Sequence, residues 1–176
     1  MKEIPLSQGK VALVDDEDYE VLHLSKWCAQ RSRSGITFYA ERSIYHPGGR
    51  WTHEKMHRFV LAWALDRELI KGEKVDHRNG DGLDNQRSNL RVATNAQNLR
   101  NCYRHAANAS SRFLGVSWHK ANGKWTAQIG VNGKKVYLGI HATEMAAAQA
   151  REAYIAARPE LMARSNFQNP ERTQSP

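Results

Sequence analysis

The chain has 176 residues, of which 40% are hydrophobic and 25% are charged. This composition excludes a disordered chain, and the length suits one ordinary domain or two small ones. The longest strictly apolar run, residues 59–65, is far shorter than the roughly 20 residues that cross a membrane, so we expect no membrane segment. The formal net charge of +8 favours a polyanionic partner, most often nucleic acid.

The distribution of charge and cysteine refines these expectations. Basic and acidic residues balance in residues 1–55, and the basic excess lies in residues 56–176, where we expect contact with DNA. Cys28 and Cys102 form no C-x-x-C pair, so no structural zinc is expected. Two reduced thiols are the favoured interpretation, and a disulfide between them stays open. Residues 1–5 lack the apolar core of a signal peptide.

The first part of the chain, residues 1–55, is predicted to be a β-rich extension. The acidic run at residues 15–18 suits the positive end of a helix dipole, so we expect it to open a short helix. A metal site in this run is the weaker alternative, because nothing nearby completes one. Short apolar runs predict strands at residues 10–14, 36–43 and 50–55, the last two joined by a turn at Pro47-Gly48-Gly49.

The next part, residues 56–104, is predicted to be a helix followed by a strand–loop–strand–helix unit. Apolar residues at helical spacing predict the first helix at residues 56–69. Thr94 and Gln97 form a capping box, which predicts that the last helix starts at Thr94. Strand-like runs are found at residues 74–77 and 90–93, on either side of a turn-rich loop at residues 79–85.

Polar residues converge at one end of this unit. Asp76 and His77 end the first predicted strand, Asn89 ends the loop, and Asn98 lies in the first turn of the helix. Taken singly, an Asp-His pair is common, and an asparagine in a turn usually makes a local Asx turn. The joint spacing, with Asn89 and Asn98 following His77 by 12 and 21 positions, favours a shared site.

The segment 57–101 resembles phage-type HNH endonucleases, which have a ββα-metal fold and often spread as homing endonucleases. Its last motif position holds Asn where other members hold His. The resemblance implies packing or loop support for His57, which opens an apolar helix. The motif residues are His57-Arg58, Asp76-His77, Asn89-Leu90-Arg91, Thr94, Asn98 and Asn101.

The resemblance also implies a role for each polar residue. Asp76 and Asn98 would supply oxygen ligands to one divalent ion, Mg²⁺ or Mn²⁺. His77 would be the general base, because a histidine is able to be neutral at working pH. Asn89 would tie the loop to the backbone and hold the His77 ring. Arg78 is a candidate phosphate contact, with a solvated charge as the alternative.

The rest of the chain is predicted to form a linker at residues 105–112, a domain at residues 113–158 and an irregular tail at residues 159–176. Thr143 is expected to cap a helix at residues 144–157. Three strands are predicted at about residues 113–120, 124–131 and 134–140, joined by turns that contain Asn-Gly, the strongest short hairpin signal.

Residues 113–158 resemble the APETALA/ethylene-response-factor (ERF) DNA-binding domain, through motifs such as Phe113-Leu114-Gly115-Val116. In that family a three-stranded sheet lies in the major groove and a helix packs behind it. The plant domains carry several arginines on the DNA face and this sequence has few, which implies looser or different specificity. The implied DNA face consists of Ser117, His119, Thr126, Gln128, Lys135 and Tyr137. The implied helix-facing side consists of Val116, Trp125, Ala127, Ile129, Val136 and Leu138.

These features predict an α+β protein: a β-rich N-terminal extension, a ββα-metal HNH nuclease unit, and a three-stranded antiparallel sheet packed on one helix. We expect a metal-dependent endonuclease that nicks or cuts double-stranded DNA, of the homing type, in the cytoplasm of a bacterial or phage-infected host cell. A DNA-binding regulator with an inactive nuclease unit and a plant-type transcription factor are the alternatives. Each chain holds one expected active site, so cutting both strands needs a dimer or two sequential nicks.

Overall fold

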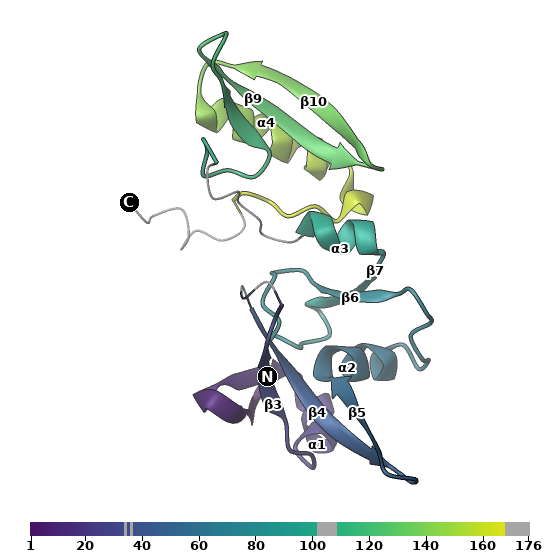
Figure 1. The fold of residues 1–176 in the computed structure, drawn as a ribbon. Coiled ribbons are helices and arrows are strands. Elements are labelled where there is room, and N and C mark those ends of the chain that lie inside the picture. Colours follow the sequence, from purple (N-terminus) through teal and green to yellow (C-terminus); the bar gives the residue numbers. More distant parts are fainter. Residues whose placement is uncertain (34, 36, 102–108, 168–176) are drawn as a thin grey trace. The chain divides into compact units, whose positions relative to one another are not determined.

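The computed structural model describes residues 1–33, 35, 37–101 and 109–167. The chain divides into two compact units, residues 1–95 and residues 96–176 (Figure 1). Three sequence-based expectations fall partly outside the described residues: Cys102, the linker at residues 105–108 and the tail at residues 168–176.

The first unit opens with two small antiparallel sheets, one pairing β1 with β2 and one in the order β3-β4-β5. Helix α1, Asp16–Leu22, begins within the acidic run, as the helix-dipole argument predicted. The sequence did not predict β1, because its four residues carry no strand pattern of their own. These elements are β1 Lys2–Pro5, the short 3-10 turn Ser7–Gly9, β2 Val11–Val14, β3 Cys28–Arg31, β4 Phe38–His46 and β5 Arg50–Lys55.

Helix α2 is shorter than the sequence predicted. It spans Met56–Ala64 rather than residues 56–69. The helix ends where Asp66 adopts a left-handed backbone with φ 50°, a conformation in which a right-handed helix cannot continue. Arg67 then donates to both carboxylate oxygens of Glu73, at 2.9 Å each, and so holds the turn that follows.

The strand–loop–strand–helix unit is present as predicted. β6, Lys74–His77, pairs antiparallel with β7, Leu90–Ala93. Helix α3, Asn95–Asn101, begins directly after Thr94. The division between the two compact units falls at residue 95, so β6 and β7 belong to the first unit and nearly all of α3 belongs to the second.

One hydrophobic core joins the N-terminal extension to α2 and β7. Met56 and Val60 on α2 are fully buried, in line with the helical spacing of the sequence. The core residues are Ile4, Ala12, Val14, Leu22, Trp27, Ala40, Met56, Val60, Leu61 and Leu90. Because both parts of the chain bury the same core, the extension belongs to the fold that carries β6 and β7.

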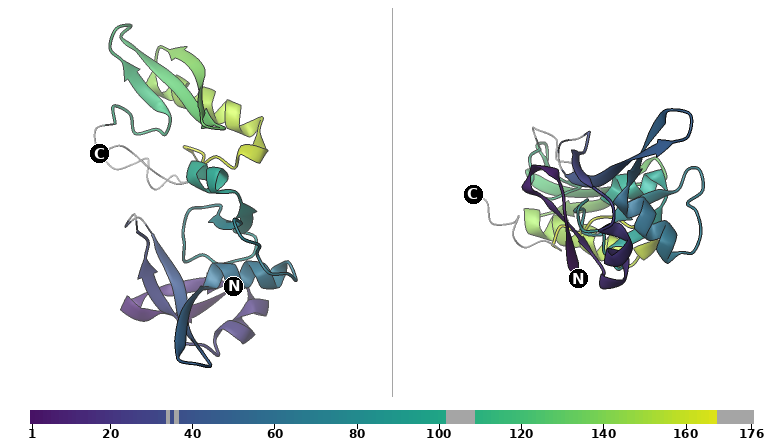
Figure 2. Two further views of the ribbon diagram at one scale, coloured as in Figure 1. Left: turned by 45° about the vertical axis from the view of Figure 1, so that its right-hand side comes forward. Right: turned by 90° about the horizontal axis from the view of Figure 1, so that it is seen from below.

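The second unit is a three-stranded antiparallel sheet in the order β10-β9-β8, with α4 packed on one face (Figures 1 and 2). The Thr143 hydroxyl accepts a hydrogen bond from the Ala146 amide at 3.1 Å, which confirms the predicted cap of α4. Buried Ala147 and Ala148 face the sheet, and their small side chains allow a close approach. The elements are β8 Val116–His119, β9 Lys124–Val131, β10 Lys134–His141, α4 Glu144–Ala156 and the 3-10 turn Pro159–Leu161.

The segment after α4 packs on the second unit. Leu161 is buried, and the Phe167 ring meets the Phe113 ring edge-on at 5.8 Å. The Asn166 side chain accepts from the Leu114 amide at 2.8 Å and donates to the Leu114 carbonyl at 3.3 Å. The packed structure of this unit therefore extends to at least Phe167.

Within the described residues the fold is mixed α and β, with four small antiparallel sheets and four α-helices. The predicted α+β class is confirmed at this level. No helix in this part of the chain is long and apolar enough to span a membrane.

Candidate functional site

Asp76 and His77 lie together at the end of β6. In the β6–β7 register Asp76 is opposite Arg91 and His77 is opposite Leu90. Both side chains are buried, at 3% and 5% exposure. Such burial of a carboxylate and an imidazole needs specific partners, and the first unit supplies them.

The His77 ring is held by Asn85, a loop residue that the sequence analysis did not single out. Asn85 is fully buried, and its Oδ1 lies 3.4 Å from His77 Nε2. The Asn85 Nδ2 donates to the Leu83 carbonyl at 3.1 Å, which fixes the amide orientation. An amide oxygen only accepts, so Nε2 carries the proton in this bond and Nδ1 holds the lone pair of the neutral ring.

Asn89 makes hydrogen bonds within the loop that follows His77. Its Oδ1 accepts from the Asn79 amide at 3.1 Å, and its Nδ2 donates to the Asp84 carbonyl at 2.8 Å. Its carbonyl accepts from the Arg78 amide at 2.9 Å, and the Arg78 side chain is exposed. The His77 ring donates its hydrogen bond to Asn85 and not to Asn89, so the two roles expected of Asn89 are divided between two asparagines.

Arg91 neutralises the Asp76 carboxylate. Its Nε and Nη2 both contact Asp76 Oδ2, at 2.8 Å and 2.7 Å. Charge-assisted contacts of this kind compensate for the burial of the carboxylate. The cross-strand position of Arg91, opposite Asp76, was the sequence signal that could have identified this pair.

Two aromatic rings, those of His57 and Tyr39, pack against the His77 ring. His57 meets His77 edge-on at 5.0 Å, and Tyr39 contacts His57 at 5.2 Å and His77 at 5.9 Å between ring centroids. Burial lowers the pKa of His77, and the hydrogen bond with Asn85 opposes part of this shift. His77 is therefore neutral at neutral pH, as a general base must be.

His57 is buried with an unpartnered ring nitrogen. Its Nδ1 makes no hydrogen bond, and the residue is 6% exposed. Burial lowers the pKa of His57 well below its ordinary value, and repulsion from His77 when that ring is protonated, and from Lys55 and Arg58, adds to the effect. The ring is consequently neutral and acts by packing against its neighbours, which agrees with the role that the sequence suggested.

The N-terminal extension holds the loop that follows His77. The Leu13 amide donates to the Leu83 carbonyl at 2.9 Å, and the Asn85 amide donates to the Leu13 carbonyl at 2.8 Å. Arg87 binds buried Asp18 through two nitrogens, at 2.9 Å and 2.6 Å. The acidic run thus anchors the loop, which makes the extension a support for the His77 site.

Gly82 shows how closely this loop approaches β4. Its amide donates to Thr37 Oγ1 at 3.0 Å. A Cβ atom built at Gly82 would lie 2.3 Å from the Phe38 carbonyl oxygen and 2.6 Å from the Tyr39 ring. Only glycine fits between the loop and the strand that carries Tyr39.

The predicted metal ligands, Asp76 and Asn98, belong to different units, so their pairing remains a prediction. Asn98 is on α3, which is held within the second unit by two side chains. Gln97 donates to the Glu160 carbonyl and Arg100 donates to the Leu161 carbonyl, both at 3.0 Å. The donor chemistry fits a hard divalent cation, because a carboxylate and an amide supply oxygen ligands.

The predicted DNA-facing residues of the second unit share one face of the sheet. The β8–β9 and β9–β10 registers place Ser117 opposite Thr126 and Tyr137 opposite Gln128. The Ser117 and Thr126 hydroxyls are 2.9 Å apart, and Tyr137 is 59% exposed. His119 and Lys135 follow the same alternation, while Val116 and Ala127 point into the core.

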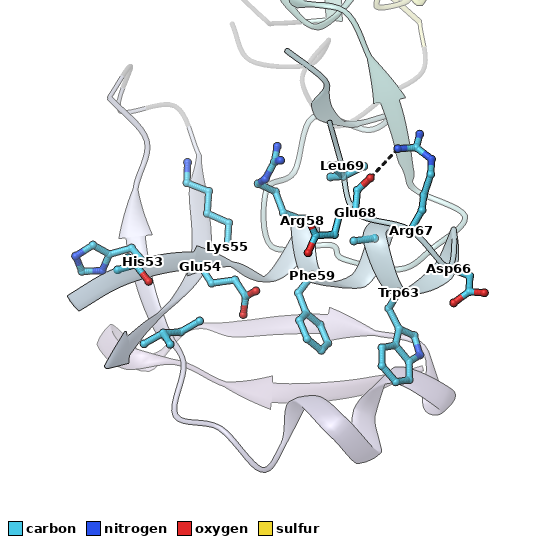
Figure 3. A pocket seen from close by; sticks show the side chains of 13 residues that line it. His53, Glu54, Lys55, Arg58, Phe59, Trp63, Asp66, Arg67, Glu68 and Leu69 are labelled. Atoms are coloured by element: carbon cyan, nitrogen blue, oxygen red, sulfur yellow. Dashed lines mark hydrogen bonds between the residues drawn. The ribbon is translucent and has the colours of Figure 1, made fainter. Parts of the chain in front are cut away.

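An open groove lies elsewhere in the first unit, between α2 and the β4–β5 hairpin (Figure 3). Phe59 and Trp63 project side by side from α2, while Lys55 and Arg58 point away from them. The groove is lined by neither Asp76 nor His77, and the sequence analysis placed no site there.

Residues 57–100 match the family model described as HNH endonuclease. The matched stretch contains α2, β6, the loop, β7 and most of α3, and includes Asp76, His77, Asn89 and Asn98. The match supports an HNH nuclease for this segment, with DNA as the implied substrate.

Proposed function

We propose that this chain is a metal-dependent endonuclease of the homing type that hydrolyses phosphodiester bonds in double-stranded DNA. The observation that carries the proposal is the buried Asp76-His77 pair, with His77 Nε2 directed at Asn85, inside the segment that matches the HNH family. A tautomer with the lone pair on Nδ1 is what a proton acceptor needs.

The proposed chemistry assigns one proton to His77. A water molecule gives a proton to His77 Nδ1 as its oxygen attacks phosphorus, and the bond from phosphorus to the 3′ oxygen breaks. Asn85 holds the ring through Nε2, and Asn89 keeps the loop in shape. The departing 3′ oxygen takes up a proton from solvent, and His77 returns its own proton to solvent before the next turnover.

Asp76 and Asn98 are the residues proposed to hold the metal ion. When bound, a divalent cation such as Mg²⁺ or Mn²⁺ stabilises negative charge on the phosphate and on the departing oxygen. Arg91 Nε and Nη2 contact Asp76 Oδ2. Asp76 is thus already oriented by β6 and Arg91, which supports its use as a ligand.

The second unit is proposed to bind DNA through an ERF-like sheet. Support comes from its three-stranded antiparallel sheet with one packed helix, and from the shared face of Ser117, Thr126, Gln128 and Tyr137. A twisted antiparallel sheet is narrow enough to enter the major groove. The second unit would then determine which DNA is bound, and the first unit would cut it.

The test is cleavage of supercoiled plasmid DNA with and without Mg²⁺. We expect the wild-type chain to nick or cut only with the metal. His77→Ala and His77→Gln should lower the rate by about 10²–10⁴-fold while circular dichroism shows a folded chain. Full activity in excess chelator, or near wild-type rates in both folded variants, would rule the assignment out.

A further inference from the structure

The hairpin of β4 and β5 has two distinct faces. The register places Ser43 opposite His53 and Tyr45 opposite Trp51, and residues opposite each other point to the same side. All four are exposed. We call these four residues, with Glu41 and Lys55, the outward face of the hairpin.

The opposite side of the hairpin packs on the first unit. Ala40 is only 1% exposed. The Arg42 guanidinium lies over the rings of Trp27 and Phe59, at 4.9 Å and 5.1 Å from their centroids. This packing fixes the hairpin against the core and turns its outward face to the solvent.

The outward face begins at the candidate nuclease site. Tyr39, two residues before Glu41 on the same strand, points to the same side and contacts both His57 and His77. Lys55 Nζ lies 4.9 Å from the centre of the Tyr39 ring. A DNA strand held at His77 would therefore continue onto this surface.

The tip of the hairpin carries an exposed aromatic pair. Tyr45 is 57% exposed and Trp51 is 61% exposed, with their ring centroids 5.0 Å apart. Exposed aromatic rings of this kind suit contact with DNA bases and sugars.

The charges of the hairpin also suit DNA. Its two acidic residues are both engaged: Glu54 binds Arg42 at 2.6 Å on the inner side, and Glu41 lies 3.4 Å from His53. Lys55 is the positive charge of the outward face, whereas Arg50, opposite His46, points to the other side of the hairpin. Lys55 is therefore the group on this face that is available to a DNA phosphate.

We propose that duplex DNA next to the cleavage site runs along the outward face, that Tyr45 and Trp51 contact one of its grooves, and that Lys55 contacts a phosphate. The proposal rests on the nuclease function proposed above. At roughly 3.3 Å per residue, the distance from Tyr39 to Tyr45 is about 20 Å. The tip therefore reaches about six base pairs from the cut, given about 3.4 Å per base pair.

The test uses the full chain in a His77→Ala background, so that binding is measured without cleavage. The probe is a fluorescein-labelled duplex of mixed sequence. The double variant Tyr45→Ala/Trp51→Ala should weaken binding by about fivefold or more. Lys55→Ala should lower the salt slope of binding by about one. Trp63→Ala is the matched control, because Trp63 is 59% exposed on α2 and points away from Lys55 (Figure 3).

The outcomes separate the two proposals. Wild-type cleavage together with unchanged binding by folded tip variants would overturn the hairpin proposal alone. A wild-type chain that neither binds nor cuts DNA would overturn the nuclease function as well. Tip variants that turn a dimer into a monomer in sedimentation, with unchanged affinity for the duplex, would show that the aromatic pair is a protein contact and would also overturn the hairpin proposal.

Discussion

Asn85 Oδ1 accepts a 3.4 Å hydrogen bond from His77 Nε2, so a fully buried loop amide selects the tautomer of the proposed base. The bond is long, and its effect depends on geometry more than on strength. The Asn85 backbone amide is itself held by the Leu13 carbonyl. The N-terminal extension thus holds the His77 ring in place through one intermediate residue, Asn85.

The first prediction concerns Asn85. Asn85→Leu removes the acceptor for Nε2, so the His77 ring loses its preferred tautomer and the cleavage rate should fall by about 10–100-fold. Asn85→Asp keeps an acceptor oxygen and should retain more activity than the leucine variant. Single-turnover cleavage and ¹⁵N shifts of the His77 ring check this, with exposed Asn122→Asp as the control. Equal rates for Asn85→Leu and the wild type would contradict the role.

The second prediction concerns the buried ion pair of Arg91 and Asp76. Arg91→Ala leaves the carboxylate without its guanidinium, and should cost about 3 kcal/mol or more of unfolding free energy. A divalent cation that binds Asp76 should then restore part of the loss, so Mg²⁺ or Mn²⁺ should raise the melting temperature more in Arg91→Ala than in the wild type.

The control for this experiment is Arg42→Ala, which breaks the comparable pair with Glu54 at a place with no proposed metal. We expect the same cations to raise the melting temperature of Arg42→Ala by no more than they raise that of the wild type. Equal metal-induced shifts in both variants would speak against Asp76 as a metal ligand.

The third prediction concerns pH. The pKa of His57 is lowered in the folded chain, so between about pH 6.5 and that lowered value the unfolded chain binds more protons than the folded one. Stability is therefore full above about pH 6.5 and falls as the pH decreases through this window. His57→Phe removes the titrating ring and the unpartnered Nδ1, so it should flatten this decline.

Urea unfolding of the full chain at pH 7 and pH 5 measures the effect, with exposed His23→Gln as the matched control. We expect the control to keep the wild-type difference between the two pH values. A His57→Phe chain that loses as much stability as the wild type on acidification would show that other groups cause the decline.

The elements of this fold with local signals were predictable from the sequence. The acidic run predicted the start of α1, and the threonine cap predicted α4. The Asn-Gly turns predicted the hairpins of the second unit. β1 was missed because only its pairing with β2 makes it a strand. The end of α2 was placed too late because the left-handed Asp66 has no signature in the apolar spacing.

The candidate site was predictable in part. The spacing of the motif residues identified Asp76, His77 and Asn89, which the structure brings together in the first unit. Asn85 could not be recognised, because its contact with His77 depends on the path of a loop held by Leu13. The anchoring of Arg87 on Asp18 was equally hidden, since it joins residues 69 positions apart.

The last prediction concerns the sheet of the second unit. Lys135 and Tyr137 point to the proposed DNA face, whereas Lys134 points to the side of Val136 and Leu138. Lys135→Ala should remove one phosphate contact and lower the salt slope of duplex binding by about one unit, with Lys134→Ala as the matched control. Tyr137→Ala should weaken binding without changing that slope, because its contact carries no charge. Measuring DNA affinity against salt concentration shows which side of β10 contacts the DNA. Equal slopes for both lysine variants would mean that the register of β10 does not select the DNA contacts, and the β4–β5 hairpin would then be the better candidate for the DNA-binding surface.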